Sequence, residues 1–287
     1  MDRRIIELYD EYTHRPLERR VFIERLAALL GGSAAAYAAL PLLENNYARA
    51  AIVEPDDPRL ATGMVTFPGA SGEIRGYIAT PKAGPPKRAG VIVIHENRGL
   101  NAHIQDVARR VALAGFTALA PDALSPLGGT PANEDEARAA FGRLDREKTV
   151  RDFVAAVAYL KSRPDASGPV GAIGFCWGGG MVNLLAVSAP DLAAGVPFYG
   201  LVAPAADAPR IKARLQLHYA GNDPRINAGI AEYEAALKGA GVAFEKFVYD
   251  GTEHAFHNDT GAARYNKAAA ELAWSRTITF LQAALRN

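Results

Sequence analysis

The chain has 287 residues, of which 49% are hydrophobic and 22% are charged, and its formal net charge at pH 7 is +1. This composition is that of an ordinary globular protein, and the balanced charge indicates neither a nucleic-acid surface nor an acidic partner. The single cysteine excludes an intramolecular disulfide and any metal site built from several cysteines. The six histidines show no HExxH-type spacing, so we predict no metal.

Residues 1–60 differ in character from the rest and are predicted to form an N-terminal helical extension. Residues 3–12 are charged and helical in pattern, whereas residues 26–43 are rich in alanine, leucine and glycine and carry no charge. The arginine pair at 19–20, the apolar run and Ala48-Arg49-Ala50 together look like a twin-arginine export signal. The alternative is a set of helices that dock on the main domain, which the acidic residues before the arginine pair favour.

The apolar run at 26–43 is interrupted by Gly31, Gly32 and Pro41, which makes it a poor transmembrane helix. We therefore predict no membrane span. The expected location is cytoplasmic, and the alternative is periplasmic export through a twin-arginine-type signal in residues 1–50.

Residues 61–287 read as one α/β domain with a mostly parallel central sheet and helices on both faces. Apolar runs rich in β-branched residues alternate with helical patterns after an initial hairpin, which is typical of parallel sheets. Strands are expected at 64–67, 74–80, 90–95, 116–120, 170–175, 195–199, 215–219 and 244–249. Helices are expected at 104–114, 134–141, 150–160, 181–187, 230–237 and 262–285.

The strand at 170–175 runs into Gly-Phe-Cys-Trp-Gly at residues 174–178, followed by two more glycines. This pattern fits the nucleophile elbow, a strand–turn–helix motif, with Cys176 where serine usually stands. The flanking glycines are needed because a Cβ there would collide with the neighbouring strand or helix. The helix N-terminus behind the turn favours a thiolate and a developing oxyanion. The alternative is a buried structural cysteine in a glycine-rich turn.

Two later loops offer the partners of such a nucleophile, in the chain order nucleophile, acid, histidine. Asp223 follows the strand at 215–219 in a Gly-Asn-Asp-Pro turn, and its alternative role is simply to form that turn. His254 follows the strand at 244–249 and could accept the proton of Cys176, with Asp223 fixing its tautomer. His257 is the competing histidine.

The loop at 95–101 leaves the strand that we expect beside the elbow strand. The backbone N–H groups of Asn97 and Trp177 are predicted to form the oxyanion hole. Glu96 is predicted to be a carboxylate near the thiol that regulates its protonation, and its alternative is an ordinary charge at the start of a loop. A carboxylate there would raise the thiol pKa, whereas an imidazolium and the helix dipole would lower it.

Four segments, at 95–101, 174–179, 221–224 and 251–256, together resemble the dienelactone hydrolase family (carboxymethylenebutenolidases) in residues and in order. The similarity extends over residues 62–285. It implies an α/β-hydrolase fold and a triad of Cys176 as nucleophile, His254 as base and acid, and Asp223 as orienter. It also implies that Glu96 accepts the thiol proton when substrate binds. The implied reaction is hydrolysis of a lactone or carboxylic ester through an acyl-thioester, without a cofactor.

Two departures from the family pattern concern the substrate. Family members that act on dienelactone carry an arginine shortly after the phenylalanine of the histidine loop, whereas residues 257–259 here are His-Asn-Asp. The loop at 121–125 also lacks the tyrosine often found there. A broader ester or lactone hydrolase is therefore as well supported as a dienelactone hydrolase. Substrate contacts are assigned weakly to Arg98, Phe256 and Tyr199.

The predicted partner is a small lactone or ester, with no nucleic acid, and the chain is expected to be a monomer or homodimer. One competing hypothesis is a non-enzymatic thiol-based redox sensor or binding protein on the same fold, because a lone thiol at a helix N-terminus can react with oxidants. Another is a hydrolase for a different bond, such as a peptide or thioester, since the triad alone does not select the leaving group.

Overall fold

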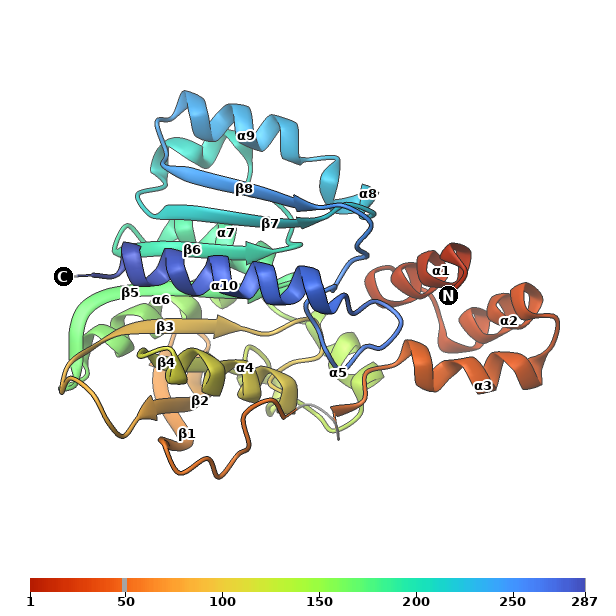
Figure 1. Ribbon diagram of the computed structural model, residues 1–287, viewed down its shortest axis with the longest axis horizontal. Coiled ribbons are helices and arrows are strands. Elements are labelled where there is room, and N and C mark those ends of the chain that lie inside the picture. Colours follow the sequence, from red (N-terminus) through yellow and green to blue (C-terminus); the bar gives the residue numbers. More distant parts are fainter. Residues whose placement is uncertain (48–50, 287) are drawn as a thin grey trace.

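A computed structural model describes residues 1–47 and 51–286 (Figure 1). Eight strands within these ranges form one sheet in the order β1-β2-β4-β3-β5-β6-β7-β8. The strands are β1 (Leu60–Gly69), β2 (Gly72–Pro81), β3 (Arg88–Ile94), β4 (Thr117–Pro121), β5 (Ala166–Phe175), β6 (Leu192–Phe198), β7 (Arg214–Ala220) and β8 (Phe244–Tyr249). The hairpin β1–β2 and the pair β2–β4 are antiparallel, and all pairs from β4 to β8 are parallel. The predicted mostly parallel sheet with an initial hairpin is confirmed.

Helices cover both faces of this sheet, as expected. Helices α4 (Ala102–Leu113) and α10 (Lys267–Ala284) pack into one apolar core on one face. Helices α6 (Arg146–Ser162), α7 (Trp177–Ser188) and α9 (Ile230–Gly239) pack into a second core on the other face. The central strand β3 is buried at every residue, which explains its continuous apolar sequence. Shorter helical segments are α5 (Glu134–Phe141), α8 (Pro224–Asn227), η2 (Ser125–Leu127) and η3 (Ala205–Arg210).

The start of the terminal helix differs from the prediction. Helix α10 begins at Lys267 rather than at residue 262, because the Asn266 side chain accepts the backbone N–H of Ala269 and caps the helix there. Residues 262–266 instead form turns that complete the loop after β8.

The N-terminal extension folds as helices α1 (Arg3–His14), α2 (Arg19–Leu30) and α3 (Ser33–Leu43). They share a small apolar core of their own, in which the Tyr12 and Phe22 rings stack at a centroid distance of 4.4 Å. Figure 1 shows this group beside the sheet end toward which the parallel strands point, the usual site of catalysis in such folds.

Within the described ranges no helix alone is long and apolar enough to cross a membrane. Helices α2 and α3 meet the length and composition test only together, with a bend of 110° between them. The Ala48-Arg49-Ala50 motif of the predicted export signal lies outside the described residues.

Candidate active site

Cys176 occupies the sharp turn between β5 and α7 with its backbone at φ +56°, a strained conformation for a residue with a Cβ. The turn closes tightly, because a Cβ on Gly174 would lie 2.2 Å from the carbonyl oxygen of Gly178. A Cβ on Gly178 would lie 2.4 Å from the carbonyl oxygen of Ile94. Both glycines are therefore required sterically, and the thiol stands at the N-terminus of α7 in the geometry expected of a nucleophile elbow.

Asp223 and His254 meet although 31 residues separate them in the chain. Nδ1 of His254 lies 2.5 Å from Oδ2 of Asp223, while Oδ1 of Asp223 accepts the backbone N–H of Ile226 at 3.2 Å and caps α8. Both side chains are buried, with exposed fractions of 5% and 2%. The carboxylate holds the proton on Nδ1, so Nε2 carries the lone pair. Nε2 has no hydrogen-bond partner among the described residues.

Opposing effects act on both groups of this pair. Burial raises the pKa of Asp223, but the hydrogen bond and charge of His254 outweigh it and the net shift is downward. Burial lowers the pKa of His254, but the charge of Cys176 and the hydrogen bond to Asp223 outweigh it and the net shift is upward. The site therefore favours an ionised carboxylate beside an imidazole that readily gains a proton.

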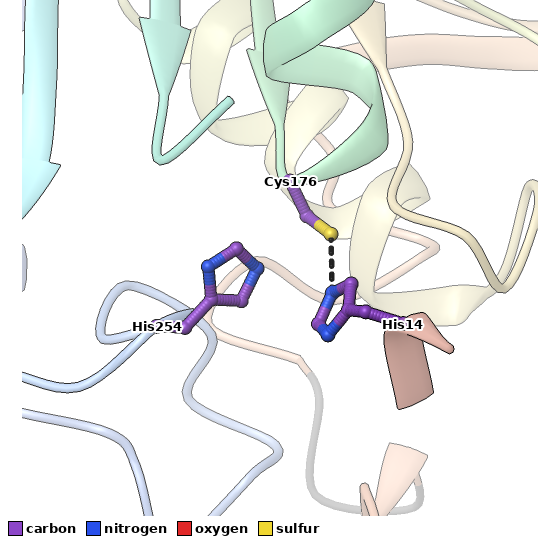
Figure 2. A group of neighbouring side chains, drawn as sticks. All are labelled: His14, Cys176 and His254. Atoms are coloured by element: carbon purple, nitrogen blue, oxygen red, sulfur yellow. Dashed lines mark hydrogen bonds between the residues drawn. The ribbon is translucent and has the colours of Figure 1, made fainter. Parts of the chain in front are cut away.

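Figure 2 shows a second histidine at the thiol, which the sequence analysis did not identify as a site residue. Nε2 of His14, the last residue of α1, lies 3.1 Å from Sγ of Cys176. The His14 ring meets the His254 ring edge-on at a centroid distance of 4.6 Å. No motif surrounds His14, and only the docking of α1 brings it to a residue 162 positions away.

Glu96 is buried beside the same group. It lines a small cavity of about 20 Å³ together with His14, Cys176 and His254. Its Oε2 accepts a hydrogen bond of 2.8 Å from the Asn258 side chain, and its Oε1 has no partner among the described residues. The structure thus brings Glu96 to the cavity that holds the thiol.

A larger cavity of about 920 Å³ is also lined by Cys176. Asn97 and Trp177, whose N–H groups were predicted as oxyanion donors, both line it. Residues 13–18 of the N-terminal extension form part of the wall. The lining as a whole is mainly apolar and includes four arginines: Arg15, Arg138, Arg146 and Arg225. The volume lies in the range of small-molecule sites, which is about 300–1,000 Å³.

The other predicted residues are not among those that line the larger cavity. Arg98 lines the small cavity but is buried and paired with Glu134 at 3.1 Å. Tyr199 and Phe256 have no exposed surface, and the Tyr199 ring packs against His254 at 5.0 Å. His257, the competing histidine, stacks on a phenylalanine of β5 instead of contacting Asp223.

His14, Cys176 and His254 also offer donor atoms that all lie within 4.8 Å of one another, so this trio could hold a soft cation. The expectation of no metal rested on spacing along the chain, which does not register ligands from three distant segments. The absence of a metal therefore stays a prediction.

Comparison with known proteins agrees with this geometry. The model of the dienelactone hydrolase family matches residues 74–285. The chain belongs to the dienelactone hydrolase family. It is therefore a hydrolase with the α/β-hydrolase fold, and hydrolysis of a carboxylic ester or lactone fits the family.

Individual relatives of this dienelactone hydrolase family member cover most of its length. A Saccharolobus solfataricus protein named "Putative carboxymethylenebutenolidase" is 33% identical over 256 residues, covering 76% of this chain and 97% of its own. A Bradyrhizobium protein named "Probable 2-oxo-3-(5-oxofuran-2-ylidene)propanoate lactonase" is 33% identical, covering 75% and 91%. The solved structure of a dienelactone hydrolase-like promiscuous phosphotriesterase from metagenomic libraries shares the fold, with a TM-score of 0.70, 24% identity, and coverage of 79% and 100%.

Proposed function

We propose that this protein hydrolyses a small carboxylic ester or lactone with Cys176 as the nucleophile, through an acyl-thioester intermediate. The observation that carries the proposal is the strained thiol at the N-terminus of α7, next to the buried pair of His254 and Asp223. A nucleophile, a histidine and a carboxylate that orients the histidine are the parts of an acyl-transfer site.

We assign a group to each step. The sulfur attacks the carbonyl carbon, and the N–H groups of Asn97 and Trp177 stabilise the oxyanion. The leaving oxygen departs with the proton that the thiol released. His254 then activates the water that hydrolyses the thioester. Glu96, in the small cavity beside the thiol, is the proton acceptor that the family resemblance implies.

The larger cavity supports a substrate with an apolar body. Its wall is formed mainly by apolar side chains, among them Phe141, Leu144, Met181, Leu184 and Leu201. The exposed Arg15 and Arg146 in its lining would accept a substrate that carries a carboxylate, although the family's arginine after Phe256 is absent. The name of the Bradyrhizobium relative refers to a lactone, which supports this substrate class.

The test is turnover of 4-nitrophenyl acetate and of a panel of lactones with and without a free carboxylate. Cys176→Ala is expected to abolish turnover, and His254→Ala to lower kcat by several orders of magnitude, because triad members act as a unit. Cys176→Ser is also expected to lose most activity, since an alkoxide needs a stronger base than a thiolate. Mass spectrometry of quenched wild-type enzyme should show an acetyl group on Cys176.

Full turnover by Cys176→Ala would refute the proposal. Peroxide oxidation of the thiol without turnover of any ester would instead support the sensor hypothesis. Thermal unfolding of each variant checks that the loss of turnover is not a loss of folding.

A further inference from the structure

The end of helix α1 is fixed against the catalytic domain by several polar contacts. The Asn97 side chain donates to the carbonyl oxygen of Thr13 at 2.8 Å, and the Tyr12 hydroxyl donates to Asp135 at 2.6 Å. The guanidinium of Arg138 lies 4.0 Å from the centre of the Tyr12 ring and also donates to the Tyr12 carbonyl oxygen. The residues just before His14 are thus held by the loop at 95–101 and by α5.

The surroundings of the His14 ring determine which nitrogen carries its proton. Nδ1 lies 2.9 Å from the Thr13 hydroxyl oxygen, 3.0 Å from the carbonyl oxygen of Asp10 and 3.0 Å from Asp10 Oδ1. The two Asp10 oxygens can only accept, and the Thr13 hydroxyl already donates to the Asp10 carbonyl oxygen, so it too is an acceptor for Nδ1. The proton of neutral His14 therefore resides on Nδ1, and the lone pair resides on Nε2. Nε2 points at Sγ of Cys176 from 3.1 Å, so the thiol can donate its proton there (Figure 2).

Asp10 remains a carboxylate in this position. Burial raises its pKa, but the hydrogen bond from His14 and the charges of His254, His14 and Arg225 outweigh burial, and the pKa is held well below its ordinary value. Arg225 lies 3.5 Å from Asp10 Oδ2 and 3.4 Å from His254 Nδ1, so its positive charge stands between Asp10 and His254. Asp10 and His14 thus repeat, next to the same thiol, the pairing of Asp223 and His254.

Glu96 is the competing acceptor for the thiol proton. One of its oxygens is already engaged by Asn258, and no hydrogen bond joins it to Sγ among the described residues. His254 is the other candidate, but its Nε2 has no hydrogen-bond partner among the described residues, whereas Nε2 of His14 lies 3.1 Å from Sγ and makes this hydrogen bond. The side chain of His14 is also only 11% exposed, so water competes weakly for Nε2.

We propose that His14, oriented by Asp10, is a second catalytic histidine that accepts the Cys176 proton, so the N-terminal extension supplies part of the active site. This deepens the proposed function and rests on it. In acylation the S–H bond breaks, its proton moves to His14 Nε2, and the sulfur lone pair forms the S–C bond. The C–O bond then breaks, and the leaving oxygen takes the proton from His14.

In deacylation the other histidine, His254, is the general base. His254 Nε2, which has no hydrogen-bond partner in the part of the chain that the structure describes, takes a proton from water while the water oxygen bonds to the thioester carbon. The S–C bond breaks, and the sulfur regains a proton from His254. Protons and electron pairs balance over the two half-reactions, and no further reactant is required.

The test compares wild-type enzyme with His14→Ala, with Asp10→Asn and with Glu7→Gln, an exposed residue of the same helix, as the control. All assays contain a chelator, so that metal bound at the thiol does not affect them. Turnover is measured with 4-nitrophenyl acetate, whose leaving group needs no proton, and with an ethyl ester, whose leaving group does. Alkylation of Cys176 by iodoacetamide is followed from pH 5 to pH 9.

His14→Ala is expected to lower kcat on the activated ester by about 10²- to 10⁴-fold, the range typical of general acid–base groups. The loss on the ethyl ester is expected to be larger, because the leaving oxygen also loses its proton donor. Thiol alkylation at neutral pH should slow, and added imidazole should restore part of the turnover. Asp10→Asn is expected to give a smaller loss in the same direction, and Glu7→Gln none.

Full turnover and unchanged alkylation in His14→Ala would overturn the proposal. The proposed function would still hold in that case if Cys176→Ala has no turnover. A loss of turnover with an unchanged alkylation profile and no rescue by imidazole would also overturn it, because His14 would then act only by packing. If His14→Ala does not fold, the alkylation profile and ester ratio of Asp10→Asn decide the matter. Full turnover by Cys176→Ala would refute the proposed function itself.

Discussion

Asp259 anchors the loop that carries His254, and its charge should contribute measurably to stability. Its Oδ1 lies 3.0 Å from Nδ1 of the buried His103, and its Oδ2 accepts a hydrogen bond of 2.7 Å from Arg110. Burial raises the pKa of Asp259, but the hydrogen bond from His103 and the charge of Arg110 outweigh it and hold the pKa at about 2, against an ordinary value of 3.8. A difference of just under two pKa units corresponds to about 2 kcal/mol of stability.

The sign follows from the depressed pKa. The stabilisation is fully present above the ordinary pKa of 3.8 and is lost as the pH falls through about 2. Wild-type protein is therefore expected to exceed Asp259→Asn by about 2 kcal/mol in free energy of unfolding at pH 7, and by roughly half of that at pH 3. Urea unfolding at several pH values measures this difference.

The control for this experiment is Asp191→Asn. Asp191 is 70% exposed and pairs with Lys161 on the surface, where ion pairs contribute little, so its substitution should change the unfolding free energy by less than about 0.5 kcal/mol. A difference between wild type and Asp259→Asn that stays constant from pH 7 to pH 3 would refute the electrostatic account. A constant difference would mean that the aspartate acts through packing or neutral hydrogen bonds.

Three further substitutions test the site. Asp223→Asn should lower kcat on 4-nitrophenyl acetate by about 10³-fold or more, because the amide no longer fixes the His254 tautomer; near-normal kcat would contradict this. Tyr199→Phe should leave the unfolding free energy unchanged or slightly higher, since its buried hydroxyl has no hydrogen-bond partner among the described residues; a loss above about 1 kcal/mol would reveal a missing partner. Gly178→Ala should cost about 3 kcal/mol or more, measured by urea unfolding, because its Cβ would meet the Ile94 carbonyl oxygen; unchanged stability would show a looser turn.

Local patterns in the sequence were enough to predict most of the catalytic domain. The elbow at 174–178 is recognisable because its steric requirement is local, with glycines next to the residue that takes a strained backbone. Asp223 and His254 could be predicted because parallel strands deliver the loops at their carboxyl ends to one edge of the sheet. The start of α10 was wrong because a cap at Asn266 decided it, and an apolar pattern does not show where a cap forms.

His14 could not be predicted in the same way. The periodicity of residues 3–12 indicates a helix with an apolar face, but it does not say which surface that face covers. The position of α1 depends on partners elsewhere in the chain, such as Asp135 and Asn97, and the sequence around neither residue indicates that α1 docks there. A site assembled by docking of two segments therefore leaves no local signal in either segment.

This docking also bears on the two interpretations of the N-terminal extension. Arg19, one of the arginine pair, binds Glu44 at 2.8 Å and Asp135 at 3.1 Å, so it joins α2 to α3 and to α5. An export signal must present its arginines to a receptor, whereas the folded chain engages one of them in holding the helices together. Removal of residues 1–50 would take His14 and one wall of the larger cavity away from the thiol. The extension can be both an export signal and a wall of the active site only if it stays attached after transport. The location of the protein would then depend on a segment that its active site also needs.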